Sequence, residues 1–209
     1  MSTSINIFDF VGKDDIRAWM REPIQIAGKL AATDGRTMFV SNKRSNLPDP
    51  ETTSLERIEN FLEIAAAADF YPIPELSFPE MPPCAECKGS GKHDLKTCPE
   101  CDGFGDAEAE TDYNTYDVEY KTCGGAGKVE SGQPVGECQA CGGKGKCWTE
   151  IDRMKVKGIP FDMNPNLMSR IAGVPDMQIA PLENTDISKS MAFKCADGIG
   201  IIMGMRDAT

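Results

Sequence analysis

Four copies of one short cysteine phrase lie in the middle of this 209-residue chain. Two residues between paired cysteines let both sulfurs turn toward one ion, and one such pair supplies half of a tetrahedral zinc shell. The glycines that follow permit the positive φ with which the backbone folds around the sulfurs. The copies are CAECKGSG (84–91), CPECDGFG (98–105), YKTCGGAG (120–127) and CQACGGKG (138–145). A segment so polar is predicted to gain its folding energy from bound metal.

The distribution of the nine cysteines also favours metal over disulfides. Eight of them lie between Cys84 and Cys147, and Cys195 stands apart. The N-terminus, MSTSINIFDF, has neither the basic region nor the apolar region of a secretory signal. No apolar run approaches the roughly 20 residues that a membrane span needs. We therefore expect a cytoplasmic protein whose clustered thiols bind metal and which has no membrane partner.

A proline-rich stretch marks the boundary of this segment. YPIPELSFPEMPP (71–83) contains five prolines, which exclude a helix and favour a stiff extended connection. The sequence thus predicts a discontinuous α+β domain formed by 1–83 and 148–209, with 84–147 inserted into it as a separate metal-binding domain.

The first flank predicts a short helix, a hairpin and an amphipathic helix. The short helix begins at Asp14 and Asp15 and ends before Pro23. The hairpin turns at Asp34-Gly35, a dipeptide that accepts positive φ at little cost. A possible capping box, Thr53 with Glu56, precedes the second helix. One face of that helix carries Ile58, Phe61, Leu62, Ala65 and Ala66.

The second flank predicts a strand at KGIPFD (157–162), a helix in NPNLMSRIAG (164–173) and a strand at DMQIAP (176–181). A last hairpin turns at Asp197-Gly198. With a strand at FDF (8–10), each flank runs strand, helix, then a hairpin with Asp-Gly at its tip. We interpret the flanks as a pseudo-duplicated unit whose order, with the phrase LAATDGRTMFV, is similar to a repeat of the DNA sliding-clamp fold; the alternative is an unrelated α+β sheet domain.

The four cysteine phrases resemble the cysteine-rich zinc-finger domain of DnaJ-type (Hsp40) chaperones, over about 64 of the 209 residues. In that family the first and fourth phrases share one zinc ion, and the second and third share another. The resemblance implies a complete first site and a second site with three of its four ligands. The first set is Cys84, Cys87, Cys138 and Cys141, and the second is Cys98, Cys101 and Cys123.

Tyr120 stands where the second site would have its fourth cysteine. Three replacements are conceivable: His93, the single histidine of the chain; Cys147; or an acidic side chain such as Asp117 or Glu119. Cys147 follows the fourth phrase and is expected near the complete site. The second site could also lack an ion altogether. The chain has no His-Pro-Asp tripeptide and no Gly/Phe-rich linker, so the resemblance implies a zinc scaffold without implying Hsp70 stimulation.

Net charge restricts the partner. The chain has 22 Lys and Arg against 33 Asp and Glu, and the segment 84–147 has seven Lys against twelve acidic residues. This balance is unfavourable for binding a phosphate backbone and favours a protein partner. Within 106–119, DAEAETDYNTYDVE is either a solvated strand face or a surface that imitates the charge of DNA. Tyr113, Tyr116 and Tyr120 either anchor a contact or cover the weakened second site.

No catalytic motif accompanies these features. A four-cysteine shell is closed, and the sequence has no phosphate loop, no dinucleotide-binding glycine fingerprint and no GxSxG elbow. We therefore expect a non-enzymatic protein.

The leading hypothesis is a zinc-binding adaptor or inhibitor that binds another protein, such as a nucleic-acid enzyme. Its make-up resembles accessory proteins of bacteriophages. One alternative is a co-chaperone-like holdase for unfolded chains. The other is a clamp-like DNA-associated protein, for which Lys13, Arg17, Arg170 and Lys189 would have to converge. The sequence leaves the partner's identity and the oligomeric state open.

Overall fold

The computed structural model describes residues 4–13, 15–47, 50, 55–93, 95–132, 136–182 and 189–206. The chain divides into two compact units. The first, Met1–Pro79 with Thr149–Thr209, is called the sheet unit, and the second, Glu80–Trp148, the cysteine-rich unit. Among the described residues, no helix has the length and apolar character that crossing a bilayer requires.

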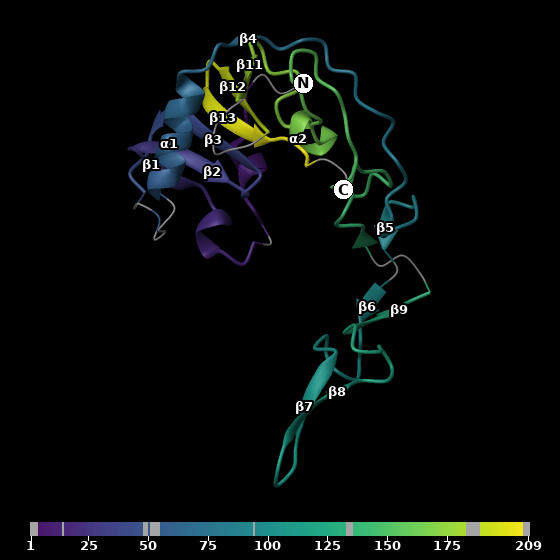
Figure 1. Cartoon of the computed structure of the whole chain (residues 1–209). Coiled ribbons are helices and arrows are strands. Elements are labelled where there is room, and N and C mark those ends of the chain that lie inside the picture. Colours follow the sequence, from purple (N-terminus) through teal and green to yellow (C-terminus); the bar gives the residue numbers. More distant parts are fainter. Residues whose placement is uncertain are drawn as a thin grey trace. The chain divides into compact units, whose positions relative to one another are not determined.

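The sheet unit is built on one seven-stranded antiparallel sheet (Figure 1). Its order is β1-β2-β3-β13-β12-β11-β4, so strands from the two flanks pair directly, β3 with β13 and β4 with β11. The strands are β1 Ile24–Ile26, β2 Lys29–Thr33, β3 Thr37–Arg44, β4 Tyr71–Pro72, β11 Gln178–Leu182, β12 Ser190–Cys195 and β13 Gly198–Met203. One sheet thus requires both ends of the chain, because neither flank alone contains all of its strands.

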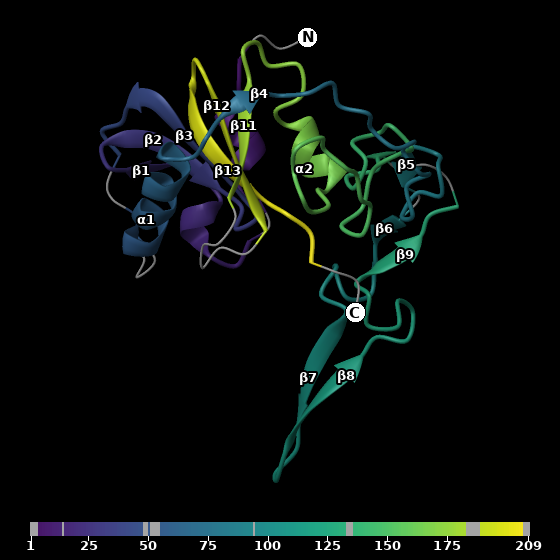
Figure 2. The same ribbon diagram turned by 45° about the horizontal axis from the view of Figure 1, so that its top comes forward.

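Each face of the sheet buries an apolar cluster, because alternate side chains of a strand point to opposite faces. On one face Phe10, Phe39 and Phe193 pack with ring centroids 5.5 to 6.0 Å apart. Helix α2 (Pro165–Ser169) covers this face and α1 (Leu55–Ala66) covers the other, as Figure 2 shows. Burial on both faces makes this unit a conventional hydrophobic fold.

Helix α1 confirms the amphipathic helix predicted from the first flank. Ile58 and Ala65 are buried against the sheet, Phe61 and Leu62 are partly buried, and Ala66 is exposed. The predicted capping box lies partly outside the described residues, because Thr53 is not among them. The hairpin at Asp34-Gly35 is also confirmed, since β2 ends at Thr33 and β3 begins at Thr37.

Two predictions for the first flank were wrong. The strand expected at FDF is the 3-10 helix η1 (Ile7–Phe10), because the Asn6 side chain accepts a hydrogen bond from Phe8 N and starts a turn there. The helix expected to begin at Asp14 and Asp15 and to end before Pro23 is, among the described residues, only η2 (Ala18–Met20), and Asp14 itself is not described. The Asp15 carboxylate accepts from Arg17 N at 2.9 Å, which offers the backbone a turn in place of a helix.

Two predictions for the second flank were also wrong. KGIPFD forms no strand, because Gly158 has a φ of +88° and Pro160 has no N–H to donate to a ladder. The last hairpin turns at Ala196-Asp197, and Gly198 begins β13. A Cβ at Gly198 would overlap the carbonyl oxygen of Val40, so the close strand contact itself explains the glycine. The strand at 176–181 is confirmed as β11, and the helix in 164–173 as α2.

The predicted duplication is not what the structure shows. The strands that should begin the two halves, at FDF and in KGIPFD, are both absent from the sheet. Each half instead contributes three consecutive strands to one sheet, β1–β3 from the first half and β11–β13 from the second. The fold is mostly β, with few helices among the described residues.

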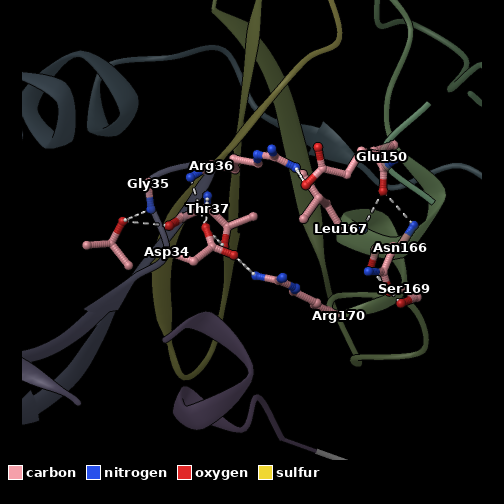
Figure 3. A network of polar contacts seen from close by, with 11 residues as sticks. Asp34, Gly35, Arg36, Thr37, Glu150, Asn166, Leu167, Ser169 and Arg170 are labelled. Atoms are coloured by element: carbon pink, nitrogen blue, oxygen red, sulfur yellow. Dashed lines mark hydrogen bonds and ion pairs between the residues drawn. The ribbon is translucent and has the colours of Figure 1, made fainter. Parts of the chain in front are cut away.

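An ion pair ties the β2–β3 turn to α2 (Figure 3). One carboxylate oxygen of Asp34 accepts from Arg36 N at 2.9 Å and Thr37 N at 2.6 Å, and the other lies 2.6 Å from Arg170 Nη1. Only 19% of the Arg170 side chain and 14% of the Asp34 side chain are exposed. Both oxygens of the Asp34 carboxylate thus accept hydrogen bonds, which hold the turn in place against α2.

The cysteine-rich unit is one long antiparallel excursion of the chain. Its outgoing and returning arms pair at β5–β10, β6–β9 and β7–β8. The strands are β5 Lys92–His93, β6 Leu95–Thr97, β7 Asp106–Glu110, β8 Thr115–Glu119, β9 Lys128–Glu130 and β10 Gly136–Glu137. These short ladders alternate with the cysteine phrases, so each phrase on one arm faces a phrase on the other.

Candidate metal centres

The first cluster joins the first and fourth cysteine phrases. Cys84 Sγ lies 3.8 Å from Cys138 Sγ, and Cys87 Sγ lies 3.8 Å from Cys141 Sγ. All four sulfurs lie within 4.8 Å of one another, and all four residues are buried. Residues 54 positions apart in the sequence therefore meet as one set of four thiols.

These distances fit a metal and exclude a disulfide. A disulfide has an S–S length of about 2.0 Å, and all nine cysteines are free. Four thiolates around Zn²⁺, with Zn–S bonds of about 2.3 Å, have an S–S edge of about 3.8 Å when the geometry is tetrahedral. The four sulfurs of the first cluster thus lie at the separation that such an ion requires.

The backbone crosses itself closely to bring the phrases together. Cys84 N donates to Gly145 O at 2.8 Å, and Cys138 N donates to Gly91 O at 3.0 Å. A Cβ at Gly91 would overlap the carbonyl oxygen of Gly143. The second glycine of the phrase is therefore needed for the approach of the two chain segments as well as for its φ of +72°.

Backbone amides and neighbouring sulfurs set the acidity of the first cluster. Burial raises the pKa of the Cys87 thiol, but the amides of Gly91 and Gly89 and the nearby sulfurs outweigh it, so that the pKa falls to about 6. The Cys141 amide lowers the pKa of Cys138, but burial and the adjacent sulfurs raise it to about 11. Adjacent thiols lose their protons one after another because each thiolate repels the next. A divalent cation removes that repulsion.

The second cluster contains Cys98, Cys101 and Cys123, whose sulfurs also lie within 4.8 Å of one another. Cys101 Sγ and Cys123 Sγ are 3.8 Å apart. Cys98 and Cys101 are buried, whereas Cys123 is half-buried. The two cysteine clusters could both bind metal ions, the first with four thiols and the second with three.

The structure separates the proposed replacements for the missing fourth ligand. Cys147 packs against the first cluster, as its position after the fourth phrase indicated. Asp117 and Glu119 are exposed, and among the described residues no carboxylate oxygen joins the second cluster. His93 pairs with Gly136 in the β5–β10 ladder, but its side chain is not among the parts of the chain that the structure describes.

The basic residues of the flanks are partly neutralised inside the sheet unit. Arg17 pairs with Asp15 at 2.8 Å and thereby lowers the pKa of that carboxyl to about 2. Arg170 is occupied by Asp34. Two of the four cations that would have to converge on DNA are therefore held by carboxylates of the same unit.

Comparison with known proteins finds similarity to a chaperone over part of this chain. An alignment of 122 positions, which covers 56% of this chain, is 30% identical to the chaperone protein DnaJ of Paramagnetospirillum magneticum. The chain spans about 30% of the length of that relative. Part of the chain is thus distantly homologous to DnaJ, and its cysteine clusters are consistent with a DnaJ-type zinc finger.

No family model matches the chain, and no solved structure matches it. The likeness of the flanks to sliding clamps and the likeness to bacteriophage accessory proteins therefore stay predictions.

Proposed function

We propose that this chain is a non-enzymatic, zinc-dependent protein-binding protein, related to chaperones through its cysteine-rich unit. The β7–β8 hairpin is its contact surface, and basic, partly apolar segments of other proteins are its ligands. The observation that carries this proposal is that all ten residues of the two strands are exposed. Figures 1 and 2 show the ribbon projecting from the rest of the cysteine-rich unit.

The hairpin has two chemically different faces, because residues that pair directly share a face. Ala107 pairs with Val118, and Ala109 pairs with Tyr116, which makes one face apolar. The other face carries five carboxylates and one threonine. These are Asp106, Glu108, Glu110, Asp117, Glu119 and Thr115. The same alternation of acidic and apolar residues is present in the sequences DAEAE and TYDVE.

Such a ribbon is poorly stabilised by itself. An isolated two-stranded sheet is marginal in water, and carboxylates that face each other across a ladder repel. Asp106 faces Glu119, and Glu108 faces Asp117. A cationic segment of a ligand on the acidic face would relieve the repulsion. An apolar segment of the same ligand would cover the opposite face, where Tyr116 and Val118 are 52% and 49% exposed.

The exposure of Tyr113 and Tyr116 favours contact over coverage of the second cluster, whereas Tyr120 is half-buried. Tyr113 is 91% exposed at the turn of the hairpin, and Tyr116 stands on its apolar face. Exposed tyrosines are frequent anchors of protein interfaces. The six carboxylates of 106–119, with no Lys or Arg among them, complement a basic chain and would attract it at long range.

The experiment measures binding of labelled unfolded polypeptides to the zinc-loaded full chain. Two probes of equal length and hydrophobicity carry opposite net charge. We expect the cationic probe to bind, salt to weaken it, and the anionic probe to bind much more weakly. Failure of the cationic probe to bind at large molar excess of the chain would overturn the proposed function.

Two variants locate the contact. Tyr116→Ser with Val118→Thr removes the apolar face, and Glu108→Gln with Asp117→Asn removes charge from the other; both should weaken binding while zinc content is unchanged. The matched control is Glu56→Gln in α1, an exposed carboxylate of the sheet unit. If both hairpin variants bound the cationic probe as tightly as the parent chain does, the contact would have to lie on another surface.

A further inference from the structure

The two clusters are built on the same backbone frame. Cys98 N donates to Gly127 O at 2.9 Å, as Cys84 N donates to Gly145 O at 2.8 Å in the first cluster. A Cβ at Gly105 would overlap the carbonyl oxygen of Gly125, which repeats the close approach of the first cluster. The second and third phrases therefore cross in the way that the first and fourth do.

Tyr120 occupies the place of the missing thiol within this frame. Tyr120 N donates to Gly105 O at 3.0 Å, and Cys138 N donates to Gly91 O at the same distance. The residue change has thus removed one sulfur without changing the backbone crossing that would have positioned it. Three of the four ligand positions of a tetrahedral site therefore still hold cysteines, on a backbone that matches that of the first cluster.

The three remaining sulfurs keep the arrangement of a metal site. Gly105 N donates to Cys101 Sγ at 3.2 Å, and Gly145 N donates to Cys141 Sγ at 3.2 Å in the first cluster. Amides aimed at sulfur stabilise thiolates. With the Sγ–Sγ distance of 3.8 Å between Cys101 and Cys123, the cluster fits three corners of the shell that Zn²⁺ prefers.

The Glu119 carboxylate, one of the expected replacements, does not serve as the fourth ligand among the described residues. Glu119 packs over Gly125, with its Cδ 3.1 Å from the position of a Cβ on that glycine. Glu137 makes the equivalent contact with Gly143 in the first cluster, at 3.3 Å. Because the complete cluster needs no carboxylate and still has this contact, the position of Glu119 reflects packing.

The second cluster is also the more accessible of the two. All four cysteines of the first cluster are buried, whereas Cys123 is half-buried. A metal ion held here would therefore have one vacant corner and a partly open side. Closed shells are typical of structural zinc sites, whereas an open position lets the ion exchange a ligand.

We propose that the second cluster binds Zn²⁺ through Cys98, Cys101 and Cys123 and offers its fourth coordination position to a nitrogen or sulfur donor of another molecule. Water fills that position when no donor is present. Three thiolates around Zn²⁺ give the site a net charge of about −1, so a neutral imidazole can complete the shell without adding charge, and a thiolate would give it the charge of a four-cysteine site. This inference does not depend on the hairpin contact proposed above, since it concerns a different surface.

Cobalt is a suitable probe because Co²⁺ replaces Zn²⁺ in thiolate sites and its visible spectrum reports the ligand set. The full chain is loaded with Co²⁺ in buffer without thiols and titrated with imidazole. We expect two ions per chain, of which one responds to imidazole with a saturable change in spectrum.

Three variants test the assignment. Tyr120→Cys should complete the second shell, abolish the imidazole response and tighten the second ion by about tenfold or more, because a thiolate replaces water. Tyr120→Phe keeps the ring and removes the phenol oxygen, and His93→Gln removes the single histidine. Both should bind two ions and respond to imidazole as the parent chain does.

Three results would overturn the proposal. The first is one ion per parent chain, which would show that three thiols do not suffice. The second is two ions without an imidazole response. The third is a changed cobalt spectrum in Tyr120→Phe or His93→Gln before imidazole is added, which would show that the chain closes its own shell. The parent chain and Tyr120→Phe decide the matter even if Tyr120→Cys fails to fold.

Discussion

The two units of this chain draw their stability from different sources. In the sheet unit, large apolar side chains such as Phe10, Phe39 and Phe193 are fully or almost fully buried between the sheet and its helices. In the cysteine-rich unit, every described residue that is buried is a cysteine or a glycine. One unit can fold by hydrophobic burial, whereas the other lacks the apolar material and depends on what its sulfurs bind.

Removing the metal is the strongest way to break this comparison. Structural zinc contributes about 10–16 kcal/mol in zinc-finger peptides, so a strong chelator should unfold the cysteine-rich unit and leave the sheet unit folded. Hydrogen exchange read by mass spectrometry resolves the two units within one sample.

Cys138→Ser with Cys141→Ser should have the same effect as the chelator on the first cluster. Cys195→Ser is the matched control, because this thiol lies in β12 of the sheet unit. Unchanged protection of 84–91 after chelation would show that the unit is stable without metal.

Acid should release the metal more gradually. The pKa of Cys87 in the folded chain, about 6, lies below that of an unfolded thiol, about 9. The contribution of this thiolate to the stability of the cysteine-rich unit is therefore complete above pH 9 and is lost as pH falls toward 6. Below pH 6 the Cys87 thiol must also lose a proton before it can bind the ion, so zinc affinity should fall more steeply there. A zinc-sensitive dye measures the release. Equal zinc affinity at pH 7 and pH 5 would contradict this expectation.

A core substitution sharpens the comparison from the other side. Phe193→Ala removes a fully buried ring that stacks on Phe39 at 6.0 Å, and should destabilise the sheet unit by about 3–5 kcal/mol. Denaturant unfolding measures this loss. Zinc content should not change, and Tyr113→Ala at the exposed hairpin turn should leave the stability of the sheet unit as it is. Loss of zinc in Phe193→Ala would mean that the two units fold together.

The smallest expected effect distinguishes two glycines of the first cluster. Gly142 has a φ of +55° and open space around it, so Gly142→Ala should cost about 1 kcal/mol from the left-handed conformation alone. Gly91→Ala also drives a methyl group into the carbonyl of Gly143 and should cost about 3 kcal/mol. Competition with a chelator of known affinity measures both, and equal losses would argue against the close backbone crossing.

Local patterns predicted the elements that depend on near neighbours in the sequence. The Asp34-Gly35 turn, the apolar face of α1 and the cysteine phrases follow from interactions within a few residues. The prediction failed at FDF, where an asparagine cap favours a turn, and at KGIPFD, where Gly158 has a positive φ and Pro160 cannot donate to a ladder. Those competing signals are also local, because Asn6 caps a turn two residues ahead and Pro160 has no N–H to donate to a ladder.

The sequence by itself determined that this chain has thiol pairs with the spacing and glycines of a metal knuckle. Spacing alone does not say which pairs share an ion, because that depends on contacts between residues far apart in the chain. The tertiary structure decided it through the β5–β10 and β6–β9 ladders, which set each phrase on one arm opposite its partner on the other. It also decided that β3 pairs with β13 and that Glu119 packs on a glycine, since both outcomes depend on long-range register.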